Sequence, residues 1–134
     1  ENLIIRDPYC AAGERQKVNL IKLLEIITIR VPKIEKLAVH CRELHYQDTR
    51  YVPAYKMSMD LKVLLEQRYP GVEVKVQVHP FKTNKMFHDR SIDFTLIDNT
   101  GCSVTHRFDL LGGIDLLMDQ KAATKIFRYE LGSS

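Results

Sequence analysis

The sequence lacks most of the features that mark secreted, membrane-spanning or nucleotide-binding proteins. It has no tryptophan and only three cysteines in 134 residues, and no Cys-x-x-Cys spacing occurs. Neither a disulfide framework nor a zinc knuckle is expected from so few, widely separated thiols, so we expect reduced thiols and a cytoplasmic location. No apolar run approaches the roughly 18 to 20 residues of a membrane span. No glycine-rich loop follows the first predicted strand, which excludes a P-loop or dinucleotide fingerprint.

The composition is ordinary for one globular domain. Charged residues make up 28% of the chain and hydrophobic residues 45%, and the formal net charge is +3. This charge is milder than that of typical nucleic-acid-binding domains. We expect a single domain over residues 1–131, large enough to bury its own core, with residues 132–134 as a non-native tail.

Hydrophobic periodicity predicts alternating strands and helices. Helices are expected over residues 14–30 and 54–69, because Pro32 and Pro70-Gly71 provide stop signals. Predicted strands cover residues 3–5, 34–39, 72–78, 91–97, 103–108 and 125–131, with a hairpin turn at Asp98-Asn99-Thr100-Gly101. This order predicts an α/β fold with a mixed sheet flanked by helices, built as β-α-β-α-β followed by a hairpin and a final strand.

Apolar stripes are expected to place one face of each helix in the core. In the first helix they comprise Val18, Leu20, Ile21, Leu23, Leu24 and Ile27. In the second helix they comprise Tyr55, Met59, Leu61, Leu64 and Leu65. The residues between the second strand and the second helix, 40–51, are expected to form a loop.

A histidine and an arginine precede the first hairpin strand. His88 and Arg90 are two residues apart, so in an extended segment they share a face. Imidazole can donate, accept or attack, and guanidinium can hold two phosphate oxygens at once. Lys82 and Lys85 lie in the same loop, which also carries Phe81 and Phe87, and this loop suits an anionic membrane surface or single-stranded nucleic acid.

Four short motifs follow one another along nearly the whole chain: Asp7-Pro8-Tyr9, Asn19-Leu20, His88-Asp89-Arg90 and Gly113-Ile114-Asp115. In order and spacing they resemble the motifs of the phospholipase D-like domain found at the C-terminus of MIT-domain proteins and in bacterial relatives. The resemblance implies an α/β fold equal to one half of a phospholipase D. It also implies a homodimer, because active members bring two half-sites together, and it implies further domains in a larger protein.

The chain departs from the His-x-Lys-x-x-x-x-Asp motif that active members of this superfamily carry. Arg90 stands at the lysine position and Thr95 at the aspartate position, while Asp93 is two residues early. Only one such motif is present. The resemblance therefore implies a degenerate, non-catalytic module that associates with acidic membrane lipids.

We therefore expect a phosphate-binding module, peripheral to the membrane, that uses no cofactor. The expected ligand-binding residues are His88, Arg90, Lys82 and Lys85, supported by Asp93 and Asp115. One alternative is a dimeric phosphodiesterase or nuclease with His88 as its nucleophile. Another is a protein-interaction or dimerisation domain, or a nucleic-acid binder.

Simpler roles compete for the same residues. His88 could bond nearby backbone, and Arg90 could form an ion pair with Asp89, Asp93 or Asp115. The loop phenylalanines could pack inward. A metal site is not expected from His40, Cys41, His45 and His79, because their spacings match no compact zinc pattern.

Overall fold

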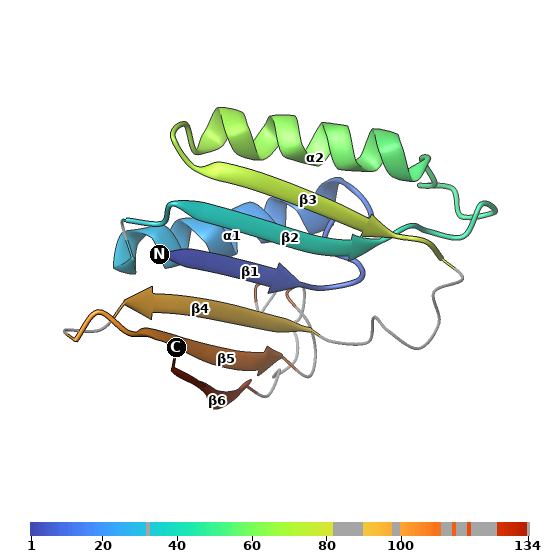
Figure 1. The fold of residues 1–134 in the computed structure, drawn as a ribbon. Coiled ribbons are helices and arrows are strands. Elements are labelled where there is room, and N and C mark those ends of the chain that lie inside the picture. Colours follow the sequence, from blue (N-terminus) through green and yellow to red (C-terminus); the bar gives the residue numbers. More distant parts are fainter. Residues whose placement is uncertain are drawn as a thin grey trace.

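A six-stranded mixed sheet forms the body of the molecule in the computed structural model (Figure 1). The structure describes residues 1–31, 33–81, 90–97, 100–110, 114 and 118, and the backbone of residues 126–133. The strands are β1 (Asn2–Arg6), β2 (Lys36–Arg42), β3 (Glu73–His79), β4 (Ser91–Ile97), β5 (Ser103–Leu110) and β6 (Ile126–Ser133). The helices are α1 (Glu14–Arg30) and α2 (Ala54–Arg68). The predicted α/β class and element order are confirmed.

The sheet has the strand order β3-β2-β1-β4-β5-β6. Strands β1, β2 and β3 are parallel to one another, because a helix connects each to the next. The remaining three strands are antiparallel to their neighbours, and β4 pairs with β1. The first strand of the chain thus lies inside the sheet, between β2 and β4.

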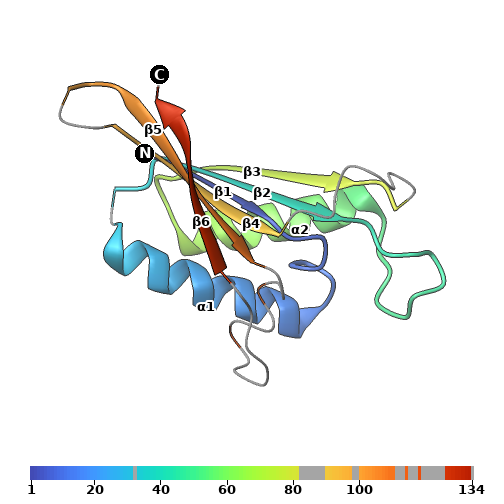
Figure 2. The same ribbon diagram turned by 90° about the horizontal axis from the view of Figure 1, so that it is seen from below.

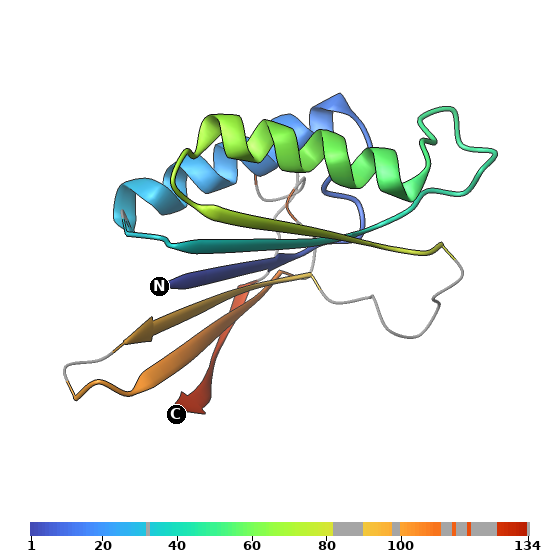
Figure 3. The same ribbon diagram turned by 45° about the horizontal axis from the view of Figure 1, so that its top comes forward.

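Both helices lie on the same side of the sheet (Figures 2 and 3). The strand residues that point toward them are the buried ones, such as Leu3, Ile5, Val39 and Cys41. No described helix covers the opposite face. Along β1, β2 and β3 the side chains on this face are intermediate or exposed, and they alternate with the side chains that face the helices. The core is therefore a single layer between sheet and helices, and the second face of the sheet is left for other contacts.

Two turns depend on glycine. Gly71 follows α2 with a φ of 89°, and Gly101 lies in the β4–β5 turn with a φ of 85°. This left-handed region is costly for residues with a Cβ. Both turns fall where the sequence predicted them.

The second predicted apolar stripe is partly wrong. Leu61 and Leu65 are buried, but Tyr55 and Met59 are 71% and 62% exposed, and Met57 is buried instead. In α1, Val18 is likewise exposed rather than buried. The predicted loop over residues 40–51 is also wrong at its start, since β2 continues to Arg42.

Candidate functional site

Basic side chains gather at the end of the sheet where the three parallel strands finish. Arg6 is paired in register with His40 on β2, and Arg42 is paired with His79 on β3. Residues paired across neighbouring strands point to the same face, here the one opposite buried Ile5, Val39 and Cys41. We call six residues at this end the cationic cluster: Arg6, His40, Arg42, His79, Arg90 and Arg107.

A buried aspartate holds two members of the cluster in place. Asp93 on β4 accepts hydrogen bonds from Arg6 Nη1 at 2.7 Å and from Arg107 Nε and Nη2 at 2.9 and 3.0 Å. Burial alone would raise the pKa of the Asp93 carboxyl, but the hydrogen bonds and charges of Arg107 and Arg6 lower it below its usual value. Asp93 therefore stays ionised and fixes both guanidinium groups.

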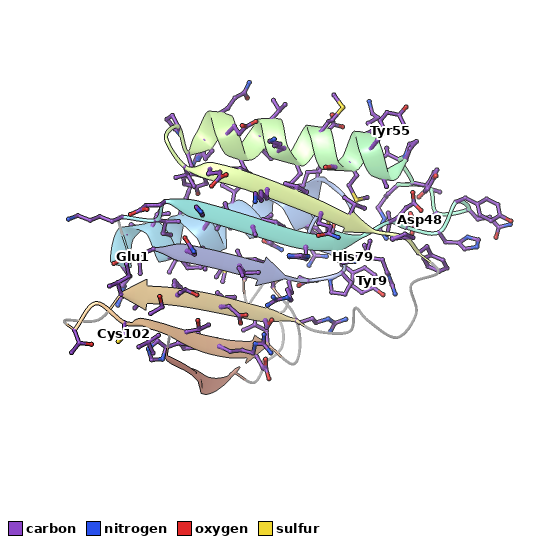
Figure 4. All side chains as sticks on the ribbon, in the orientation of Figure 1. Glu1, Tyr9, Asp48, Tyr55, His79 and Cys102 are labelled. Carbon is purple, nitrogen blue, oxygen red and sulfur yellow. The ribbon has the colours of Figure 1, made fainter. Side chains whose placement is uncertain are left out.

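The other two arginines converge on one tyrosine (Figure 4 labels Tyr9). The Arg42 guanidinium donates to the Tyr9 hydroxyl at 3.0 Å and lies 5.4 Å from the centroid of its ring. The Arg90 guanidinium lies 5.7 Å from the same centroid. In the described part of the chain, neither Arg42 nor Arg90 forms an ion pair with a carboxylate. With respect to the described residues, both can therefore bind an external anion without first releasing a carboxylate.

Two histidines contact each other beside these arginines. Nδ1 of His40 and Nε2 of His79 are 3.1 Å apart, and the two rings are stacked. Burial, the charge of Arg6 and the charge of His79 lower the pKa of His40. His40 is therefore neutral at neutral pH, and the fixed positive charge of the cluster comes from its arginines.

The loop after β1 is tied to a distant part of the chain. Asp7 is 4% exposed, and its carboxylate accepts hydrogen bonds from the backbone N–H groups of Tyr9 and Ile114, both at 2.9 Å. Ile114, the middle residue of one motif quoted above, is thus bonded to Asp7, the first residue of another. The hydrogen bond between the Tyr9 N–H and the Asp7 carboxylate orients the backbone of Tyr9.

Of the predicted site residues, Arg90 belongs to this cluster and Asp93 lies against it. Arg90 is a member, and its backbone oxygen accepts a hydrogen bond from Leu110 N–H at 2.6 Å. Of the three carboxylates considered as alternative partners of Arg90, Asp93 pairs with Arg6 and Arg107 instead, and Asp89 and Asp115 lie outside the described residues. The hydroxyl of Thr95, which stands at the aspartate position of the motif that the chain resembles, is hydrogen-bonded to the hydroxyl of Thr105 on β5.

Four predicted site residues fall outside the described residues: Lys82, Lys85, His88 and Asp115. Asp89 and Phe87 do so as well. Hydrolysis with His88 as nucleophile therefore stays an untested alternative. Phe81, the first aromatic residue of that loop, is 39% exposed, and the Arg42 guanidinium lies over its ring.

Sequence reasoning missed most of the cluster. Arg6, Arg42 and His79 are the last residues of their strands, and strand ends in a parallel βαβ unit meet at one end of the sheet. The predicted strands end at residues 5, 39 and 78, so Arg6 and His79 lie next to predicted strand ends while Arg42 lies in a predicted loop. The pairing of β4 with β1, which brings in Asp93 and Arg107, has no comparable local signal.

Searches of the chain give three negative findings. Among the residues with assigned structure, no three His, Cys, Asp or Glu side chains are grouped to hold a metal ion. No helix in that same part of the chain has the length and apolar character needed to cross a membrane. Comparison with protein-family models and with curated proteins finds no match.

Proposed function

We propose that this domain is a non-catalytic phospholipase D-like module whose cationic cluster binds phosphate groups, chiefly those of acidic phospholipids at a membrane surface. The observation that carries the proposal is the pair of guanidinium groups, Arg42 and Arg90, held against Tyr9 without a carboxylate partner in the described chain. The homodimer implied by the motif resemblance is part of the proposal.

The chemistry of the cluster suits a phosphate group. A guanidinium group presents a planar fork of donors that matches two phosphate oxygens. Contact with Tyr9 restrains both side chains before a ligand arrives, which lowers the entropy lost on binding. Arg6 and Arg107 remain bound to Asp93 and add positive potential behind them.

The surroundings of the cluster favour a membrane surface. Tyr9 is 40% exposed and Phe81 is 39% exposed at the same end of the sheet. Aromatic rings of this kind settle at the headgroup level of a bilayer, and each nearby cation adds about 1 kcal/mol of attraction to anionic lipid.

Vesicle flotation tests the proposal. The wild type is expected to bind vesicles that contain phosphatidylglycerol and not vesicles of phosphatidylcholine alone. The double variant Arg42→Gln/Arg90→Gln should bind about 30-fold more weakly, because two cations contribute about 2 kcal/mol.

A matched double variant, Lys22→Gln/Arg30→Gln, removes two exposed cations from α1 on the far side of the sheet. It should retain most of the affinity for the vesicles. Equal losses in the two double variants would show that net charge alone drives binding, and would overturn the assignment of the site. No binding by the wild type would overturn the function itself.

A further inference from the structure

A hollow of about 290 Å³ lies beside the cationic cluster, at the ends of β2 and β3. Its walls are mainly aromatic and include His45, Tyr46, Tyr51 and Phe81. Phe81 belongs to both regions, because the Arg42 guanidinium lies 5.3 Å from the centroid of its ring. A small ligand that spans this one ring would contact the hollow and the cluster together.

The rings of the hollow are packed against one another. The ring centroids of His45 and Tyr46 are 4.4 Å apart, and Phe81 meets His45 edge-on at 5.0 Å. Nδ1 of His45 accepts a hydrogen bond from the Gln47 backbone N–H at 3.2 Å, so neutral His45 carries its proton on Nε2. This wall of rings is therefore formed before any ligand binds.

A carboxylate completes the hollow. Among the described residues that line it, Glu43 alone carries a carboxylate. Oε2 of Glu43 accepts a hydrogen bond from the Ala54 backbone N–H at 3.1 Å, and the Glu43 backbone N–H donates to the His79 carbonyl at 2.8 Å. Aromatic faces together with one fixed carboxylate are complementary to an organic ammonium group.

We infer that this hollow is the ammonium subsite for a phosphoserine headgroup whose phosphate binds Arg42 and Arg90. The inference rests on the proposed function and names its lipid as phosphatidylserine. This headgroup combines a phosphate with an ammonium group and a carboxylate a few bonds away, which gives it one net negative charge. The cationic cluster is complementary to the negative charge of the headgroup, and Glu43 with its neighbouring rings is complementary to the ammonium group.

Phosphatidylserine and phosphatidylglycerol are suitable probes, because both lipids carry one net negative charge and only the first adds an ammonium group, together with a carboxylate on the same carbon that balances its charge. Flotation with equal molar fractions of each lipid should show about fivefold tighter binding to phosphatidylserine, a preference of the size expected for a partly exposed cation on aromatic rings. The variant Glu43→Gln should lose this preference. Its amide oxygen can still accept from Ala54 N–H, so the local fold is retained.

Asp48→Asn is the control, since it makes the same change of charge in the same loop without lining the hollow. It should shift binding to both vesicles equally and keep the preference. Equal binding of wild type to the two lipids, or a preference retained in Glu43→Gln, would overturn the ammonium subsite while phosphatidylglycerol binding still supports the proposed function. Failure to bind either lipid would overturn both.

Discussion

Asp93 is the residue on which the arrangement of the cluster depends most. It is 4% exposed on a central strand, where an unpaired carboxylate would be costly. Three hydrogen bonds from two guanidinium groups compensate for this burial. Those bonds also restrain Arg6 and Arg107, whose positive charges would otherwise repel one another.

The substitution Asp93→Asn should lower the free energy of unfolding by about 2–3 kcal/mol at pH 7, because two half-buried guanidinium groups lose their counter-ion. The pKa of Asp93 is lowered in the folded state, so the charge contributes stability above the unfolded carboxyl pKa. That contribution is lost as the pH falls through the lower, folded value. Urea denaturation from pH 7 to pH 3 should therefore show the difference between wild type and variant shrinking with acidity.

Asp60→Asn provides the control for this experiment, since Asp60 is exposed on α2. It should change stability by less than about 0.5 kcal/mol throughout. A deficit in Asp93→Asn of the same size at pH 3 as at pH 7 would mean that packing, rather than charge, makes Asp93 important.

At the scale of single residues, the sequence revealed Arg90 but not its surroundings. Arg90 stood out because it is two residues from His88 in a short motif. The partners of Asp93 are 87 and 14 residues away along the chain, so no local spacing links them. Glu43 and Tyr46 carried no signal either, because their role depends on where the loop after β2 lies against Phe81.

At the scale of elements, helix α2 shows what periodicity can and cannot decide. Its length was predicted to within one residue, because Pro53 and Pro70-Gly71 bound it. The choice of its buried face was not settled by spacing. Residues 55, 59 and 63 and residues 57, 61 and 65 are both apolar rows at i, i+4, i+8, and only the second row meets the sheet.

For the same kind of substitution, the two rows of α2 predict losses of stability that differ in size. Leu61 is 0% exposed, so Leu61→Ala should cost about 2–5 kcal/mol of unfolding free energy through lost burial and a cavity. Met59 is 62% exposed, so Met59→Ala should cost less than about 0.5 kcal/mol. Chemical denaturation of the two variants compares them directly, and similar losses would contradict the orientation of α2.

At the scale of the whole molecule, the alternation of strands and helices correctly gave the class and the order of elements. It did not give the position of β1 between β2 and β4, because the antiparallel β1–β4 pairing joins residues about 90 positions apart. This pairing puts Asp93 on β4 opposite Ile4 on β1. Ile4 is two residues from Arg6, so Asp93 lies on the same face of the sheet as Arg6. The part of the site that sequence reasoning missed is therefore the part created by long-range topology.

The three thiols report on the integrity of this fold. Cys10 and Cys41 are buried and Cys102 is exposed. The hydrogen bond to Cys41, together with burial, raises the pKa of the Cys10 thiol, which further slows its reaction because the thiolate is the nucleophile. Titration with Ellman's reagent should detect one rapidly reacting thiol in the native protein and three in denaturant. Cys102→Ser should abolish the rapid reaction, and rapid reaction of two or three native thiols would contradict the packing of β2 against the loop after β1.

The register of β1 and β6 shows where the residues near the two termini lie. Asn2, at the start of β1, pairs with Thr95, and Ser133, at the end of β6, pairs with Val104. These positions are at the opposite end of the sheet from the cationic cluster, as the N and C labels in Figure 1 show. A fluorophore, bead or fused protein joined at either terminus would act as a handle that leaves the cluster clear. Both attachments therefore begin at the end of the strands that lies farthest from the cluster.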